Sequence, residues 1–129
     1  MSKDRSFPEL IREHYEGLLA GDEAAYSALA HDDLVQEWPQ TGERIRGKTA
    51  CLNIARNYPG GSPELHMDRI SGEGDHWVVE GSSRYPAGTD FRVVAVLELR
   101  DGRIARETDY FGPLYPAPDW RRQWVERID

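Results

Sequence analysis

The sequence predicts an α+β domain in which helices come first and a strongly curved antiparallel sheet folds over them. Two observations carry this prediction. Apolar residues in most of the first 58 positions recur at helical spacing, whereas after Pro59-Gly60-Gly61 they follow the period of strands. The later strands are joined by connections too short for a crossover, so they must pair as an antiparallel meander. With 129 residues, the chain is expected to form a single domain over residues 1–129.

Helix boundaries are marked by specific residues near the N-terminus. Ser6 and Glu9 form a capping box, with Pro8 in the first turn, so a helix is expected to begin here. Gly21 is expected to end this helix, and Asp22 to cap a second, shorter one. A third helix is expected after a loop that contains Gly42 and Gly47, with its packed side formed by Ala50, Cys51, Ile54, Ala55 and Tyr58.

Strands are expected over residues 34–38, 64–71, 76–85, 90–100 and 103–111. Turn residues such as the Asp101-Gly102 pair separate the last four of them. After a proline-rich link, a short helix is expected from Asp119, with Trp120 and Trp124 one turn apart. We expect this helix to pack on the body of the domain, because a helix so short needs tertiary contacts.

Composition and charge exclude several classes of function. The formal net charge of −7 argues against nucleic acid as a partner, since phosphate binding requires a basic face. No membrane-spanning run and no signal peptide are found, so no membrane partner and a cytoplasmic location are expected. Cys51 is the only cysteine, and no histidines or cysteines have metal-ligand spacing. We therefore expect no metal and no cofactor.

The segment 103–111 is the most informative one for function. Alternation places Ala105, Glu107, Asp109 and Phe111 on one face, which mixes apolar and ionisable groups. Such a face is typical of a curved sheet that wraps a cavity with a few polar groups in an apolar wall. The alternative is an edge strand whose carboxylates face water. These residues alone favour neither interpretation.

The order of elements resembles the SnoaL-like branch of the nuclear transport factor 2-like superfamily, over roughly residues 7–128. The residues that carry the resemblance are Leu19-Ala20-Gly21-Asp22, Trp38-Pro39, Arg46-Gly47-Lys48, Asp101-Gly102-Arg103-Ile104 and Asp109-Tyr110-Phe111. The resemblance implies a cone-shaped roll with the N-terminal helices packed in the curved sheet. Because the superfamily includes isomerases, cyclases, epoxide hydrolases, dehydratases and inert binding domains, it does not select an activity.

Comparison with individual enzymes of this superfamily narrows the candidates. Asp109 matches a cavity carboxylate of the limonene epoxide hydrolases, but residues 80–84 lack the Arg-x-Asp set of those enzymes, so epoxide hydrolysis is not expected. Ketosteroid isomerases carry their functional Tyr and two Asp at positions that are His14, Trp38 and about Ala95 here. Isomerase activity is therefore not inherited by resemblance. In SnoaL-type cyclases a cavity carboxylate is the acid/base, and Asp109 again matches it.

The resemblance to the epoxide hydrolases would point Glu107 and Asp109 into the cone. Two carboxyl groups so close together in an apolar pocket would favour one shared proton, as suits acid/base catalysis. Alternatively, Arg84, Arg92 or Arg106 neutralises them in a structural ion pair. His14 is a candidate helper in proton transfer, or a satisfied histidine at the helix–sheet boundary. Candidate ligand-binding residues are Tyr15, Glu37, Trp38, Tyr58, Phe91 and Phe111, where only one of the neighbours Glu37 and Trp38 can face inward.

Three functions remain open from the sequence. The first is a cofactor-independent acid/base enzyme of isomerase, cyclase or lyase type, acting on a small, largely apolar carbonyl or cyclic compound. The second is a non-catalytic protein that binds a small-molecule ligand in the same pocket. The third is a protein-interaction domain. We also expect a homodimer, because Val94, Val96 and Thr108 would leave an apolar patch on the outer sheet face of a lone subunit.

Overall fold

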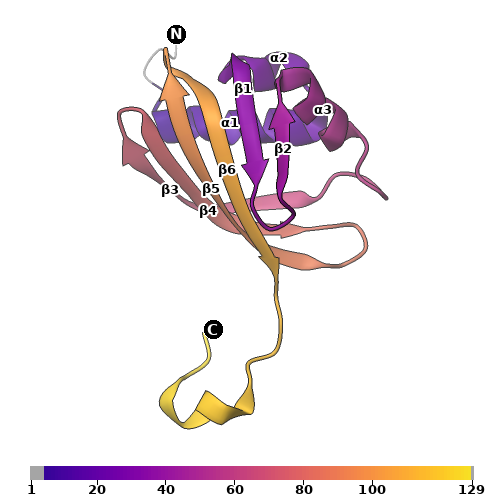
Figure 1. Ribbon diagram of the computed structural model, residues 1–129, viewed down its shortest axis with the longest axis vertical. Helices are drawn as coiled ribbons and strands as arrows, with labels where there is room; N and C mark the ends of the chain where they lie inside the picture. Colours follow the sequence, from indigo (N-terminus) through magenta and orange to yellow (C-terminus); the bar gives the residue numbers. More distant parts are fainter. Residues whose placement is uncertain (1–4, 129) are drawn as a thin grey trace.

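The computed structural model describes residues 5–128, and it confirms the predicted α+β class and the cone-shaped arrangement of helices against a curved, unclosed sheet (Figure 1). The helices are α1 (Phe7–Ala20), α2 (Glu23–Ser27) and α3 (Lys48–Arg56). The strands are β1 (Ala30–Trp38), β2 (Glu43–Arg46), β3 (Glu64–Glu73), β4 (His76–Arg84), β5 (Asp90–Arg100) and β6 (Arg103–Pro113). The helices lie on one side of the sheet, which curves around them.

The six strands follow the order β2-β1-β6-β5-β4-β3. The predicted meander from β3 to β6 is present, with each neighbouring pair antiparallel. Strand β1, whose pairing the sequence did not indicate, lies beside β6 and pairs with it in parallel. This pairing is possible because α3 and the meander lie between the two strands in the chain and bring it back in the same direction. Strand β2 was not predicted, and it forms a hairpin with β1 at residues that read as a loop.

Local capping defines the helices as the sequence indicates. Ser6 and Glu9 form the predicted capping box at the start of α1. Gly21 ends α1 with φ of 73°, a left-handed conformation that glycine adopts without strain. The side chain of Asp22 accepts a hydrogen bond from the amide of Ala25 and begins α2. None of the described helices is long and apolar enough to cross a membrane.

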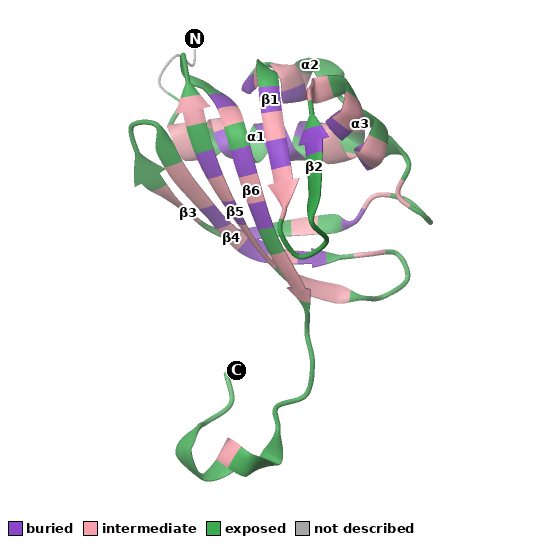
Figure 2. Ribbon diagram, in the orientation of Figure 1, coloured by how far each residue is buried: buried purple, intermediate pink, exposed green. Residues whose placement is uncertain are grey.

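The core lies between the helices and the inner face of the sheet, where buried residues alternate with more exposed ones along the strands (Figure 2). Ile11, Leu34, Leu97 and Ile104 have no exposed surface. Gly81 on β4 allows the neighbouring strand to come close, since a Cβ atom there would lie 2.1 Å from the carbonyl oxygen of His66. The register shifts nearby, between Met67 and Arg69, and such irregularities accompany strong curvature.

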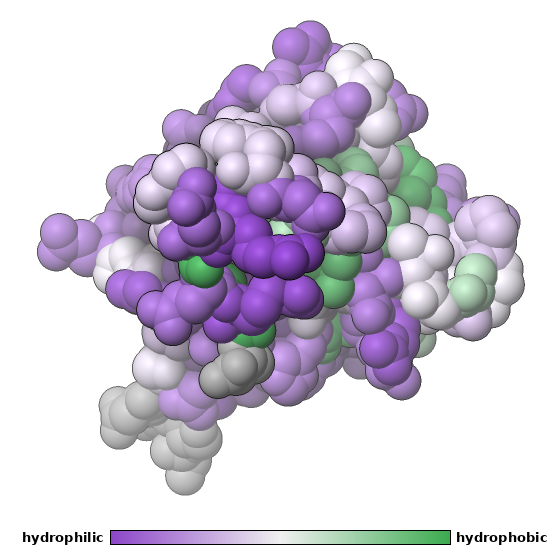
Figure 3. Space-filling view, turned by 90° about the horizontal axis from the view of Figure 1, so that it is seen from below, coloured by the Kyte–Doolittle hydropathy of each residue, from purple (hydrophilic) through white to green (hydrophobic). Residues whose placement is uncertain are grey.

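The C-terminal segment does not pack as expected. Residues Asp119–Trp124 form a 3-10 helix, η1, and the segment extends away from the domain (Figures 1 and 2). Trp120 and Trp124 each remain 72% exposed and Ile128 98% exposed. In a 3-10 helix, residues four apart do not share a side, so the two tryptophans form no common stripe. In the view from below, with this segment nearest the reader, hydrophobic residues appear between largely hydrophilic ones (Figure 3).

Candidate functional site

A cavity of about 350 Å³ lies between the helices and the inner face of the sheet. Its wall is mostly apolar and aromatic, with contributions from α1, β1 and the meander strands. The polar side chains that line it include Tyr15, Gln36, Glu107 and Asp109. A cavity of this size with a few converging polar groups is the usual form of a small-molecule site.

Two carboxyl groups come from alternate positions of β6. Glu107 and Asp109 are 3% and 9% exposed, and both belong to the cavity wall. Strand β1 runs beside β6 with Gln36 in register with Glu107. The Gln36 amide therefore donates to both carboxyl groups, at 3.4 Å to Glu107 Oε2 and through a short hydrogen bond to Asp109 Oδ2. The Trp38 indole also donates to Asp109 Oδ2, at 3.0 Å.

Glu107 holds its proton more tightly than an ordinary glutamate. Burial raises the pKa of Glu107 well above its usual value, and the charge of Asp109 and a hydrogen bond with it raise that pKa further. The nearby Tyr15 hydroxyl acts in the opposite direction, but by less. Asp109, by contrast, accepts two hydrogen bonds at one oxygen, from Gln36 and Trp38.

Two buried polar atoms on the cavity wall lack a protein partner. Asp109 Oδ1 and the Tyr15 hydroxyl have no hydrogen-bond partner among the described residues. Burial raises the pKa of Tyr15 well above its ordinary value, so this hydroxyl stays protonated. An acceptor and a donor without a protein partner are thus carried by two residues of the same cavity wall.

The arginines considered as partners of the carboxyl pair bind elsewhere. Arg84 pairs with Asp90, at 2.7 Å and 3.0 Å. Arg92 pairs with Asp68 at 3.2 Å.

The third of these arginines, Arg106, pairs with Glu37 at 2.7 Å on the outer face of the sheet. No lysine, arginine or histidine belongs to the cavity wall in the part of the chain that the structure describes. The described structure therefore does not contain the structural ion pair that was the alternative for Glu107 and Asp109.

His14 occupies a different place from the one expected of a catalytic helper. It is 1% exposed, its ring stacks on Tyr26, and its Nδ1 lies 3.0 Å from the carbonyl oxygen of Tyr26. Burial lowers the pKa of His14 to about 4. His14 is not part of the cavity wall, whereas its neighbour Tyr15 is. Proton transfer by His14 to a ligand is not supported by this position.

Strand β1 settles the choice between Glu37 and Trp38. Trp38 belongs to the cavity wall, and Glu37 faces the outer side, between Arg44 and Arg106. Gln36, two residues before Trp38 and therefore on the same face, was missed, although alternation along the strand would have indicated it. The Cys51 thiol donates to Gln36 Oε1 at 3.2 Å, which turns the Gln36 NH₂ group toward the carboxyl pair. Burial raises the pKa of Cys51 to about 11, so this thiol remains a donor.

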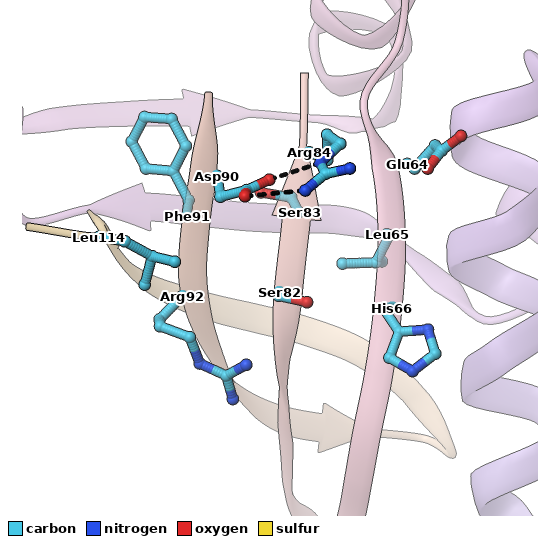
Figure 4. A pocket seen from close by; sticks show the side chains of 10 residues that line it. All are labelled: Glu64, Leu65, His66, Ser82, Ser83, Arg84, Asp90, Phe91, Arg92 and Leu114. Atoms are coloured by element: carbon cyan, nitrogen blue, oxygen red, sulfur yellow. Dashed lines mark hydrogen bonds and ion pairs between the residues drawn. The ribbon is translucent and has the colours of Figure 1, made fainter. Parts of the chain in front are cut away.

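The other predicted ligand-binding residues, Tyr58, Phe91 and Phe111, lie on the cavity wall. A second depression, of about 570 Å³, is lined by residues of β3, β4 and β5 with Leu114 beyond the end of β6 (Figure 4). Its charged residues include Arg84 and Asp90, which satisfy each other. Among residues 5–128, no group of three or more His, Cys, Asp or Glu is arranged to hold a metal ion. The carboxyl-lined cavity is therefore the candidate site.

Comparison with known proteins gives this cavity a family context. A similar crystal structure is an NTF-2 like protein of unknown function from Burkholderia xenovorans, with 36% identity, coverage of 95% of this chain and 94% of that chain, and a TM-score of 0.80. A putative ketosteroid isomerase from Kribbella flavida is 30% identical, with coverage of 94% and 88% and a TM-score of 0.81. An epoxide hydrolase of Mycobacterium tuberculosis, described as LEH-like, is 29% identical, with coverage of 81% and 80% and a TM-score of 0.67.

A curated relative, the uncharacterized protein YesE of Bacillus subtilis, is 26% identical over an alignment of 126 positions, which covers 82% of this chain and 81% of that protein. The family model described as the SnoaL-like domain matches residues 11–107, from the first helix through the strand that carries Glu107. The chain therefore belongs to the SnoaL-like domain family of the NTF2-like superfamily.

Proposed function

We propose that this protein is a cofactor-independent acid/base enzyme that moves a proton on a small, largely apolar carbonyl compound, with Asp109 as the base. The observation that carries the proposal is the pair of unpartnered, buried polar atoms on one cavity wall, Asp109 Oδ1 and the Tyr15 hydroxyl. One is a proton acceptor, and the other is a donor for an oxygen that gains negative charge. Among residues 5–128, no basic side chain belongs to this wall, which supports a role in chemistry over a structural role.

The expected reaction begins with removal of a proton from the carbon next to the carbonyl group. The C–H bond breaks, the proton passes to Asp109 Oδ1, and the electron pair moves to the carbonyl oxygen to give an enolate. The Tyr15 hydroxyl and the protonated Glu107 are the donors that stabilise this oxygen. Asp109 then returns the proton to the same or another carbon. Gln36 and Trp38 donate to Asp109 Oδ2, which leaves Oδ1 as the oxygen that takes the proton.

Similar proteins support this reaction class without deciding it. The names of two structural neighbours refer to a ketosteroid isomerase and an epoxide hydrolase. This chain lacks the Arg-x-Asp set expected for epoxide opening on β4, which reads Glu80-Gly81-Ser82-Ser83-Arg84. Proton transfer needs only the groups present here, Asp109, Glu107 and Tyr15.

Exchange of carbon-bound hydrogen tests the proposal without knowledge of the natural substrate. Small cyclic ketones are incubated with the protein in D₂O, and NMR measures the incorporation of deuterium next to the carbonyl. The parent should accelerate exchange, and Asp109→Asn should lose at least about 100-fold of that acceleration, because it keeps the shape and removes the basic atom. Glu37→Gln, a carboxylate change on the outer face of the same sheet, is the matched control and should retain full exchange.

Equal exchange by the parent and Asp109→Asn, with both folded by circular dichroism, would overturn the proposal. Binding of the same ketones without any accelerated exchange would indicate a non-catalytic binding protein, the alternative function for the same cavity.

We further propose that the chain forms a homodimer through the outer face of the meander. Val94 and Val96 remain partly exposed there, and Tyr110 is 46% exposed. Val96 is in register with Val78 on one side and Thr108 on the other, which makes the apolar area continuous. Light scattering should give about twice the chain mass of 14.7 kDa, and Val94→Arg should give the mass of one chain. A monomeric parent at all concentrations would contradict this.

A further inference from the structure

The aromatic residues of the cavity form one continuous row rather than scattered contacts. Tyr58 contacts Tyr85, Tyr85 contacts Phe91, Phe91 contacts Phe111, and Phe111 contacts Trp38, with ring centroids between 5.4 Å and 6.3 Å apart. All five side chains line the cavity. We call this set the aromatic row.

Neighbouring rings of the aromatic row are inclined to each other by 66° to 90°. Such edge-to-face contacts are usual between aromatic side chains, and they give neighbouring parts of the wall different ring orientations. A row that served only as packed core would need no free space beside it, but here the cavity lies against all five rings. The arrangement is suited to a compact, rounded group.

Among the described residues, the acidic and basic side chains on the wall of this cavity are all acidic. The cavity wall carries Glu43, Glu107 and Asp109, and within the described chain it carries no basic side chain. Trp38 links the aromatic row to the carboxyl pair, because its indole belongs to the row and also donates a hydrogen bond to Asp109. Burial raises the pKa of Tyr58, and the negative charge of Asp109 adds to this effect, which is consistent with a carboxylate close to the row.

We propose that the aromatic row binds an alkylammonium group, a tertiary or quaternary amine, with Asp109 as its counter-charge. The negative faces of aromatic rings attract a cation, and the attraction is strongest where water is excluded. Methyl groups around the nitrogen fill the space between the rings, and the carboxylate balances the charge without a fixed hydrogen bond. This binding goes beyond the proton transfer proposed above, because the row holds the cation whether or not any reaction follows.

An isosteric pair of probes tests the proposal on the unmodified protein. Choline and 3,3-dimethyl-1-butanol have the same shape, and they differ in a positive nitrogen that is replaced by a neutral carbon. Calorimetry or NMR titration should show choline binding at least about tenfold more tightly than the alcohol. Equal affinity for the two, or tighter binding of the alcohol, would show that the row is only an apolar wall and would overturn the proposal.

Variants locate the preference for the cation. Phe91→Leu and Phe111→Leu keep an apolar side chain and remove a ring face, so each should weaken choline binding several-fold and change the alcohol much less. Tyr115→Leu removes an aromatic ring that is 80% exposed on the C-terminal segment, and it should change neither affinity. Retention of full choline affinity in both phenylalanine variants would also overturn the proposal. The ketone exchange assay is independent of choline, so failure of one proposal leaves the other measurable.

Discussion

The carboxyl groups on the two faces of the sheet have opposite environments, although they lie on neighbouring positions of the same two strands. On the outer face, Glu37 lies 2.7 Å from Arg44 and 2.7 Å from Arg106. One position away on the inner face, Glu107 is opposite the neutral amide of Gln36 and beside a second carboxyl group, Asp109.

The same residue type therefore has opposite acid strength on the two faces. The arginines lower the pKa of Glu37, through the hydrogen bond with Arg44 first, while burial and Asp109 raise that of Glu107. A carboxylate with guanidinium partners is ionised and stabilises the sheet. A carboxyl pair with only amide and indole donors keeps a proton and an unpartnered oxygen, which is the condition for acid/base chemistry.

The largest effect is expected from a substitution that places a positively charged side chain on the inner face, like the arginines beside Glu37 on the outer face. Gln36→Lys would place an ammonium group beside Glu107 and Asp109, and it should lower the pKa of Glu107 back toward its ordinary value. Carbon-13 NMR of the side-chain carboxyl groups, followed against pH, measures this change. Deuterium exchange of ketones should fall with it, since the pair then behaves as a structural ion pair.

Gln36→Met is the control for this change, since it has similar length and no charge. Glu107 should keep its raised pKa in that variant, because burial and Asp109 are unchanged. If Gln36→Lys left the titration of Glu107 where it is in the parent, the absence of a cation would not be what distinguishes the two faces.

The difference between the faces is also the part of the site that sequence reasoning reached least well. Alternation along β6 paired Glu107 with Asp109, and their placement on the cavity wall agrees with that pairing. The hydrogen-bond partners of these two carboxyl groups were harder to predict, because they lie on β1. That strand ends just before Pro39, so the sequence did not show which of its residues face inward. Alternation along β6 already places Arg106 on the face opposite to Glu107 and Asp109. That Glu37 would lie beside it depended on the pairing of β1 with β6, which no local pattern indicated.

Neighbouring positions on a helix were likewise difficult to separate. His14 and Tyr15 differ by about 100° around α1, and both fit the apolar stripe, yet only Tyr15 reaches the cavity. Helix caps and turns were predictable because they depend on residues close in sequence, such as Ser6 with Glu9. Local patterns gave no signal for the four-residue strand β2, which forms by pairing with β1. They also did not show that the segment around Trp120 stays exposed, because that depends on whether the rest of the domain offers a surface to cover it.

The next effect in size concerns the pH dependence of stability through Glu107. Its pKa is raised in the folded protein, so its contribution to stability is complete below the ordinary value of 4.5 and is lost as pH rises toward the raised value. Glu107→Gln should remove this loss, which amounts to at most about 1.4 kcal/mol for each pH unit in that window. Urea unfolding of parent and variant between about pH 4 and pH 8 measures the slope.

The free energy of unfolding of Glu107→Gln should rise relative to that of the parent as pH rises, because the parent must then ionise a buried group. A parallel pH dependence in the two proteins would mean that Glu107 is ionised in the folded state, contrary to the contrast between the two faces.

The smallest effect, with the opposite sign, is expected for Glu37. Because Arg44 and Arg106 lower its pKa, its contribution is present above the ordinary value of 4.5 and is lost as pH falls through the lowered value. Glu37→Gln should therefore be slightly less stable than the parent at neutral pH and equal to it in acid. The melting temperature should fall by only a few degrees at most, since such exposed ion pairs are screened by water and salt. Differential scanning calorimetry at neutral and acid pH, each at low and high salt, measures both features. A loss that persists unchanged in high salt and in acid would show that Glu37 acts through packing, and the outer face would then not be the purely electrostatic counterpart of the inner one.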